Sequence, residues 1–172
     1  MRDTITKRAA KENDKLFVEA NTAWDAGDLR RAFQLFSRAA ELGDSSSQLD
    51  LGYFFDRGLH VKKDKTKAMH LYHQAYRQGD AAGANNIATL NRECGRVGKM
   101  LWWLRRAVAM GNHEALLELG KCYETGVGLP KCPRRATLCY RRILVSEQVS
   151  ELCKERAQRR LAKLKRHERK AI

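Results

Sequence analysis

Apolar and small residues recur along the chain at the three- and four-residue spacing of an amphipathic helix, and this pattern itself repeats in longer blocks. The stretch LGYFFDRGLH at 51–60 has a near copy, LGKCYETGVG, at 119–128. A large apolar residue in the helix that follows recurs at intervals of 36, 32 and 36 positions, at Phe36, Tyr72, Leu104 and Tyr140. Repeats of this length predict a solenoid of helix pairs.

Small residues face large ones within each predicted pair. Gly52 and Gly120 would let the first helix of a pair approach the second closely, while Tyr72 and Tyr140 would fill the space between the helices. We therefore expect two antiparallel helices per repeat.

Capping signals lie between the predicted helices. Asp28 and Asp64 are typical N-caps, Ser45-x-x-Gln48 has the form of a capping box, and Pro133 suits the first turn of a helix. Three glycines stand where a helix would end in the left-handed conformation: Gly43, Gly79 and Gly111.

The pattern divides the chain into three parts. Residues 1–14 form an N-terminal extension, residues 15–145 hold four repeats (15–43, 44–79, 80–111 and 112–145), and residues 146–172 form a basic C-terminal helix and tail. A stripe at helical spacing predicts that this last helix covers the open end of the array. It consists of Val149, Leu152, Cys153, Ala157, Leu161 and Leu164.

The second and fourth repeats are longer than the other two. Their small residues in the first and second helix are 16 positions apart instead of 12, as from Gly52 to Ala68. This longer form resembles the Sel-one-like repeat, a tetratricopeptide-like family, over roughly residues 15–145. The resemblance implies a right-handed superhelix of antiparallel helix pairs that binds other proteins. The chain departs from the pattern at Cys132, where Asp64 supplies an acid in the other copy, and at Asn91, where an aromatic residue is expected.

Composition supports an all-α fold and narrows the class of protein. Of 172 residues, 43% are hydrophobic and only two are proline. No apolar run reaches the ~20 residues that span a bilayer, and the N-terminal stretch lacks the apolar region of a secretory signal. We therefore expect a cytoplasmic protein whose five cysteines are free thiols.

The sequence contains no catalytic motif, so we expect neither an enzyme nor a cofactor. His70 and His73 are one helical turn apart but have no carboxylate or thiol nearby to complete a metal site, and none is expected. Trp102 and Trp103 could form a stacking platform, although a packing role is favoured for Trp103 because it precedes the core position of Leu104.

A second stripe on the first helix of each repeat carries the functional signal. In tetratricopeptide-like folds this stripe lines the concave groove that holds protein ligands, and aromatic residues beside charges are typical of an interface. The alternative is a solvated face whose aromatic residues pack on neighbouring repeats. The predicted groove residues are Asn21, Trp24, Asp25, Tyr53, Asp56, Arg57, Thr89, Arg92, Glu93, Lys121, Glu124 and Thr125.

Charge suggests a different class of partner. The chain has a formal net charge of +14, and the excess lies in the second helix of each repeat and in residues 146–172. Such a surface can bind nucleic acid without sequence preference. The candidate anion-binding residues are Arg159, Arg160, Lys163 and Arg166.

Together these patterns predict a non-enzymatic protein-binding module or adaptor whose groove holds a segment of a partner protein. Two alternatives stay open at this point. One is an immunity-type inhibitor of a toxin or effector, and the other is nonspecific nucleic-acid binding through the basic convex face and C-terminal helix.

Overall fold

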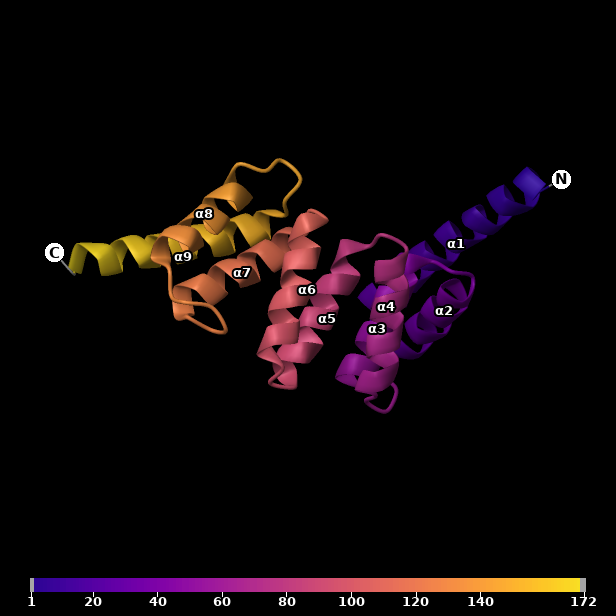
Figure 1. The fold of residues 1–172 in the computed structure, drawn as a ribbon. Helices are drawn as coiled ribbons and strands as arrows, with labels where there is room; N and C mark the ends of the chain where they lie inside the picture. The colour runs from indigo at the N-terminus through magenta and orange to yellow at the C-terminus, as the bar shows by residue number, and fades with distance from the viewer. Residues whose placement is uncertain (1, 171–172) are drawn as a thin grey trace. The chain divides into compact units, whose positions relative to one another are not determined.

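A computed structural model defines the backbone of residues 2–170 and the side chains of residues 12–166. Within this part of the chain all regular structure is helical, with nine helices and no strand (Figure 1). The all-α prediction is confirmed. The helices are α1 (Arg2–Asp25), α2 (Leu29–Glu41), α3 (Ser45–Arg57), α4 (Lys65–Arg77), α5 (Ala81–Glu93), α6 (Val97–Ala109), α7 (His113–Thr125), α8 (Pro133–Leu144) and α9 (Glu151–Lys170).

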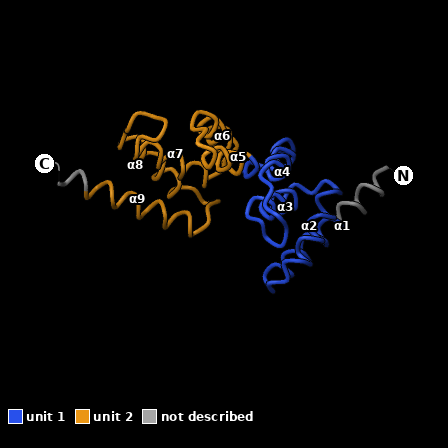
Figure 2. Tube along the Cα trace, turned by 90° about the horizontal axis from the view of Figure 1, so that it is seen from below, with its two compact units in different colours: residues 1–83 blue, residues 84–172 orange. Residues whose placement is uncertain are grey.

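The chain forms two compact units, residues 1–83 and 84–172, coloured separately in Figure 2. The first unit contains α1 to α4 and the second contains α6 to α9, while the boundary lies in the first turn of α5. The proposed start of the first repeat at residue 15 lies inside α1, which runs through that position without a break.

In the first unit α1 packs on α2, α2 on α3, and α3 on α4. Phe36 and Phe54 are almost completely buried at the centre of this packing. The predicted close approach at Gly52 is confirmed, because a Cβ atom built there would lie 2.6 Å from the ring of Tyr72. Only glycine leaves room for the tyrosine at this crossing.

In the second unit α6 packs on α7, α7 on α8, and α9 on both α7 and α8. Gly120 and Tyr140 repeat the close approach, with a Cβ atom at Gly120 only 2.5 Å from the ring. Cys153, Ala157 and Leu164 of α9 are buried against the same cluster as Tyr140. The stripe prediction is wrong for Leu152, which is 64% exposed, because its side chain points about 100° around the helix from that of Cys153.

The predicted N-caps Asp28 and Asp64 are confirmed, since each carboxylate accepts a hydrogen bond from a backbone amide in the first turn of the next helix. Ser45 is not a cap. Asp44 takes that role in α3 and accepts from the amide of Ser47 at 2.6 Å, because Asp44 has the extended backbone that a cap needs and Ser45 is already helical. The three predicted glycines do adopt positive φ, between 88° and 92°.

The two departures from the repeat pattern have visible consequences. Cys132 stands at the N-cap of α8 but its side chain makes no capping hydrogen bond. Asn91 is buried and donates from Nδ2 to the carbonyl of Ile87 at 2.8 Å, so its amide is hydrogen-bonded within α5. All five cysteines are free thiols, as predicted.

Candidate partner-binding surfaces

In the first unit, the predicted groove stripe brings aromatic and charged side chains together. The rings of Trp24 on α1 and Tyr53 on α3 lie 6.0 Å apart, and the guanidinium of Arg57 lies over the Tyr53 ring at 5.5 Å. Tyr53 is 40% exposed. Trp24 is half-buried and packs edge-on against Phe54 at 5.0 Å. We call Trp24, Tyr53 and Arg57 the aromatic surface.

The two other predicted residues of α1 differ in exposure. Asn21 is half-buried and donates from Nδ2 to the carbonyl of Phe17 at 2.9 Å, so its amide nitrogen is already engaged within the helix. Asp25 is exposed at the last residue of α1.

Asp56 does not lie on the surface. It is only 3% exposed, with Oδ2 at 3.6 Å from Nε of Arg57, and its Oδ1 atom has no hydrogen-bond partner among the described residues. Burial, with the nearby Asp56 carboxylate as the second cause, raises the pKa of the Tyr72 hydroxyl. Asp56 therefore belongs to the interior beside Tyr72, and a groove role for its side chain is corrected.

Asp50 lies one turn before Tyr53 on α3 and was not among the predicted groove residues. Burial, followed by the carboxylates of Asp44 and Asp80, raises the pKa of Asp50 to about 6. The signal was present in the sequence, because Asp50 continues the stripe of Tyr53 and Arg57 at helical spacing.

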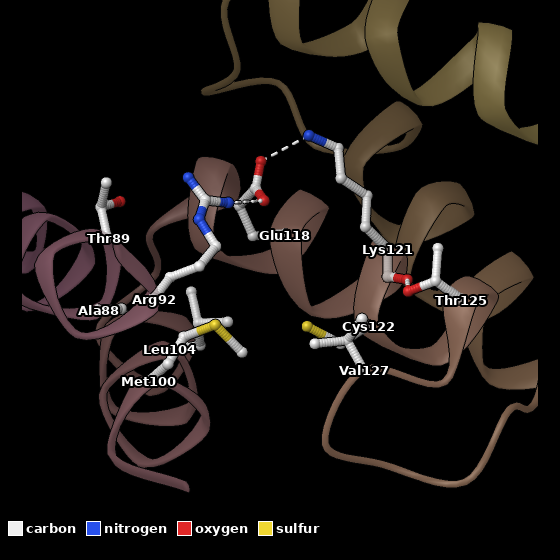
Figure 3. A pocket seen from close by; sticks show the side chains of 10 residues that line it. All are labelled: Ala88, Thr89, Arg92, Met100, Leu104, Glu118, Lys121, Cys122, Thr125 and Val127. Atoms are coloured by element: carbon white, nitrogen blue, oxygen red, sulfur yellow. Dashed lines mark hydrogen bonds and ion pairs between the residues drawn. The ribbon is translucent and has the colours of Figure 1, made fainter. Parts of the chain in front are cut away.

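In the second unit, four of the predicted groove residues line one pocket of ≈ 190 Å³ between α5, α6 and α7 (Figure 3). These four are Thr89, Arg92, Lys121 and Thr125. The rest of the lining, apart from Glu118, is formed by small and apolar side chains, namely Ala88, Met100, Leu104, Cys122 and Val127. An apolar floor with charged groups beside it is thus present in the second unit.

Glu118 organises the charged side of this pocket, and it too was not among the predicted groove residues. Its two carboxylate oxygens accept from Nη1 of Arg92 at 2.8 Å and from Nζ of Lys121 at 2.5 Å (Figure 3). Glu118 holds the same position in the fourth repeat as Asp50 does in the second. An acid three residues before Lys121 on one helix was the available signal.

Glu124 is buried, like its counterpart Asp56, and the groove assignment is corrected here too. Its Oε2 accepts from the Tyr140 hydroxyl at 2.8 Å, and Nη1 of Arg160 lies 3.4 Å from Oε1. Burial, and then this hydrogen bond, raise the pKa of Tyr140. Glu124 therefore ties α7 to α8 and α9. The last predicted groove residue, Glu93, is exposed at the end of α5.

The four candidate anion-binding residues of α9 do not form one group. Arg160 is engaged with buried Glu124, and Arg159 pairs with Glu155 one turn away at 3.4 Å. Lys163 and Arg166 are exposed. Two of the four charges thus have a partner within the unit, which weakens the predicted cationic surface.

The described part of the chain offers neither a metal site nor a membrane span. No three histidine, cysteine, aspartate or glutamate side chains there are placed to hold a metal ion. None of the helices in this range is both long enough and apolar enough to cross a membrane.

Comparison with known proteins identifies the repeat family. A family model described as the Sel1 repeat matches residues 26–44, 45–80 and 113–143. Among solved structures, a Sel1 repeat protein from Oxalobacter formigenes is 30% identical with a TM-score of 0.54, over 63% of this chain and 45% of that one. Protein 5086 of Pseudomonas aeruginosa is 25% identical with a TM-score of 0.58, over 75% of this chain and 51% of that one.

Among curated proteins, chitin synthase regulatory factor 1 of Schizosaccharomyces pombe is 29% identical over 128 residues. The match covers 70% of this chain but 28% of the yeast protein. The chain thus spans less than a third of that relative and less than half of the Oxalobacter protein.

Proposed function

Because the chain belongs to the Sel1 repeat family, whose model matches half of its residues, we propose that it binds a partner protein through the exposed faces of the first helix of each repeat. Sel1 repeat proteins generally mediate protein–protein interactions and serve as non-enzymatic scaffolds. A relative named as a regulatory factor supports a role exerted on another protein.

The pocket of the second unit is the observation that carries this proposal. Its volume of ≈ 190 Å³ is below the roughly 300–1,000 Å³ of typical small-molecule sites. It has room for one apolar side chain, and hot spots of protein interfaces are anchors of this kind that are buried in pockets. Arg92, Glu118 and Lys121 beside the floor would then provide the polar rim of the interface.

The aromatic surface of the first unit supports the same function. Tyrosine, tryptophan and arginine are the residues most enriched at interface hot spots. Trp24 also packs against the core of the first unit, so its presence is explained by packing without a role in binding. Tyr53 keeps 40% of its surface exposed and is the better probe of binding.

The test begins with a partner captured from the native source and purified as a stoichiometric complex. We expect Tyr53→Ala and Thr125→Arg each to weaken this complex by about tenfold or more, the first by removing an aromatic anchor and the second by filling the pocket. Trp102→Ala is the matched control, because Trp102 is a 49% exposed aromatic residue on α6 outside the stripe. Normal affinity in both variants would disprove binding through these faces.

A further inference from the structure

The loop between α3 and α4 leaves a hollow in the surface of the first unit. The hollow has a volume of ≈ 500 Å³ and joins α2, α3, the loop and the first turn of α4. We call it the loop hollow. It is lined by Phe33, Phe55, Val61, Lys62, Lys63, Asp64 and Lys67.

A strained residue stands beside the loop hollow. His60 has a φ of 59°, and it is the one non-glycine residue with positive φ among those described. Its counterpart in the fourth repeat, Gly128, has a φ of 67°. Left-handed backbone costs a residue with a Cβ atom roughly 1–2 kcal/mol, so glycine is the unstrained choice at this position. The chain nevertheless carries a histidine in the second repeat, and strain of this kind is concentrated at functional sites.

The two copies of the loop show what the histidine changes. Gly128 packs so closely that a Cβ atom there would overlap the side chains of Val97 and Leu101 on α6. In the second repeat His60 is exposed, and its ring lies 6.1 Å from that of Phe33, the counterpart of Leu101. The loop of the second repeat thus carries a side chain beside α2 at the position where its copy has none.

The charge around the loop hollow is positive. Lys62, Lys63 and Lys67 line it and are exposed, and none of the three pairs with a carboxylate in the described part of the chain. The Asp64 carboxylate is engaged as a helix cap, accepting from the amides of Thr66 at 3.0 Å and Lys67 at 2.9 Å. The aromatic floor of the loop hollow is thus surrounded by three lysine ammonium groups. The one carboxylate among them, that of Asp64, already accepts hydrogen bonds from the backbone.

We propose that the loop hollow binds an acidic segment of another protein, with an apolar side chain against Phe33 and Phe55 and flanking carboxylates at the lysines. Charge complementarity identifies the class of ligand, because three lysines without counter-charges attract an anion and the floor favours an apolar group. Nucleic acid fits less well. The Lys67 ammonium lies over the Phe55 ring at 5.1 Å, and Phe33 meets the rings of Phe54, Phe55 and His60 edge-on or tilted, so a flat base finds no free ring face to stack on. An aliphatic side chain needs no such face and can contact the parts of Phe33 and Phe55 that stay exposed.

This site is separate from the aromatic surface and does not depend on the function proposed above. Phe55 follows Tyr53 by two residues, so the two side chains point roughly 200° apart around α3. A partner could therefore occupy one face without the other, and the two proposals can fail independently.

The experiment titrates the full ¹⁵N-labelled chain with the capped peptide Glu-Glu-Leu-Glu-Glu at about 0.1 M salt, where long-range surface attraction is screened. We expect saturable shifts of the backbone amides at 59–67. The variant Lys62→Glu, Lys63→Glu, Lys67→Glu should bind about tenfold more weakly or not at all. A control with the same change in net charge is Arg30→Glu, Arg134→Glu, Arg141→Glu, in which three exposed arginines of α2 and α8 are altered, and it should keep its affinity.

Further variants separate binding from folding. His60→Gly should raise the melting temperature by removing strain. It should also weaken peptide binding, because a glycine would let the loop pack more closely on α2. Lys62→Ala with Lys63→Ala serves if the triple variant is unstable, and Tyr53→Ala should leave peptide binding unchanged. The proposal is overturned if the peptide causes no localised shifts, if both triple variants lose affinity equally, or if oligothymidylate binds at the loop hollow more tightly than the peptide.

Discussion

Single glycines decide how closely the helices of a pair approach. A methyl group at Gly120 would enter the ring of Tyr140, whose hydroxyl is held by Glu124, so the ring cannot easily move away. We expect Gly120→Ala to lower the free energy of unfolding by about 1–3 kcal/mol through overpacking. Urea unfolding followed by circular dichroism measures the change.

Gly98 provides the matched control for this substitution. It lies in α6, and a Cβ atom there would meet nothing within 4 Å. Gly98→Ala should therefore leave stability unchanged or raise it by up to about 1 kcal/mol, because alanine is the better helix former. Equal stability of the two variants would show that the close approach is not a constraint.

Asp50 makes stability depend on pH. Its pKa is about 6 in the folded chain against 3.8 for the unconstrained side chain, so the folded state holds the proton more tightly than the unfolded state. The stability that this proton contributes is fully present below pH 3.8 and is lost as the pH rises through about 6. At pH 7 the ionised carboxylate therefore destabilises the fold.

Removal of the charge should reverse this effect. We expect Asp50→Asn to be more stable than the wild type by about 1–3 kcal/mol at pH 7, with little difference near pH 4. Urea unfolding at the two pH values tests this, with Asp14→Asn on the exposed side of α1 as the control. A gain of equal size at both pH values would argue against titration of Asp50 as the cause.

The start of α8 lacks a favourable contact that the start of α4 has. Cys132 has φ −146° and ψ 89°, nearly the same as the −145° and 92° of Asp64, yet only Asp64 accepts amide hydrogen bonds. Cys132→Asp should therefore stabilise the second unit by about 1 kcal/mol, and Asp64→Ala should destabilise the first by a similar amount. Thermal unfolding measures both, and a Cys132→Asp variant no more stable than Cys132→Ala would refute the capping argument.

The C-terminal helix has a structural role that limits how its charge can be tested. Arg160 is engaged with buried Glu124, so reversing its charge would place two carboxylates together and disturb the fold. A charge-reversal variant for binding studies should alter Arg159, Lys163 and Arg166 and leave Arg160 in place.

At the scale of the whole molecule, the net charge of +14 makes some attraction to nucleic acid unavoidable. We expect a weak mobility shift with DNA at low salt, indifferent to sequence and lost by about 0.2 M salt as counterions are released less favourably. The variant of Arg159, Lys163 and Arg166 should reduce it. A mobility shift that persists at physiological salt and depends on these residues would instead favour nucleic acid over protein as the partner of this chain.

The sequence predicted the features that depend on periodicity and failed where side-chain reach matters. Spacing predicted the helix pairs, the glycines with positive φ at helix ends, and the contact of Gly52 with Tyr72. It could do so because helical geometry determines which positions share a face. Spacing also assigned Asp56 and Glu124 to the groove. Each lies close to a buried tyrosine of the second helix, and the distance that a tyrosine hydroxyl reaches across a helix pair cannot be read from period alone.

The alternation of short turns at 26–28 and 94–96 with long loops at 58–64 and 126–132 has a consequence for how such a chain can grow. Among the connections inside a helix pair, each compact unit holds one short turn and one long loop, so the pattern recurs only after 68 residues. Insertion or deletion of a single repeat would bring two connections of the same kind next to each other. A block of two successive repeats, one with a short turn and one with a long loop, can be added or removed without changing this order. We therefore expect such arrays to vary in length by two repeats at a time.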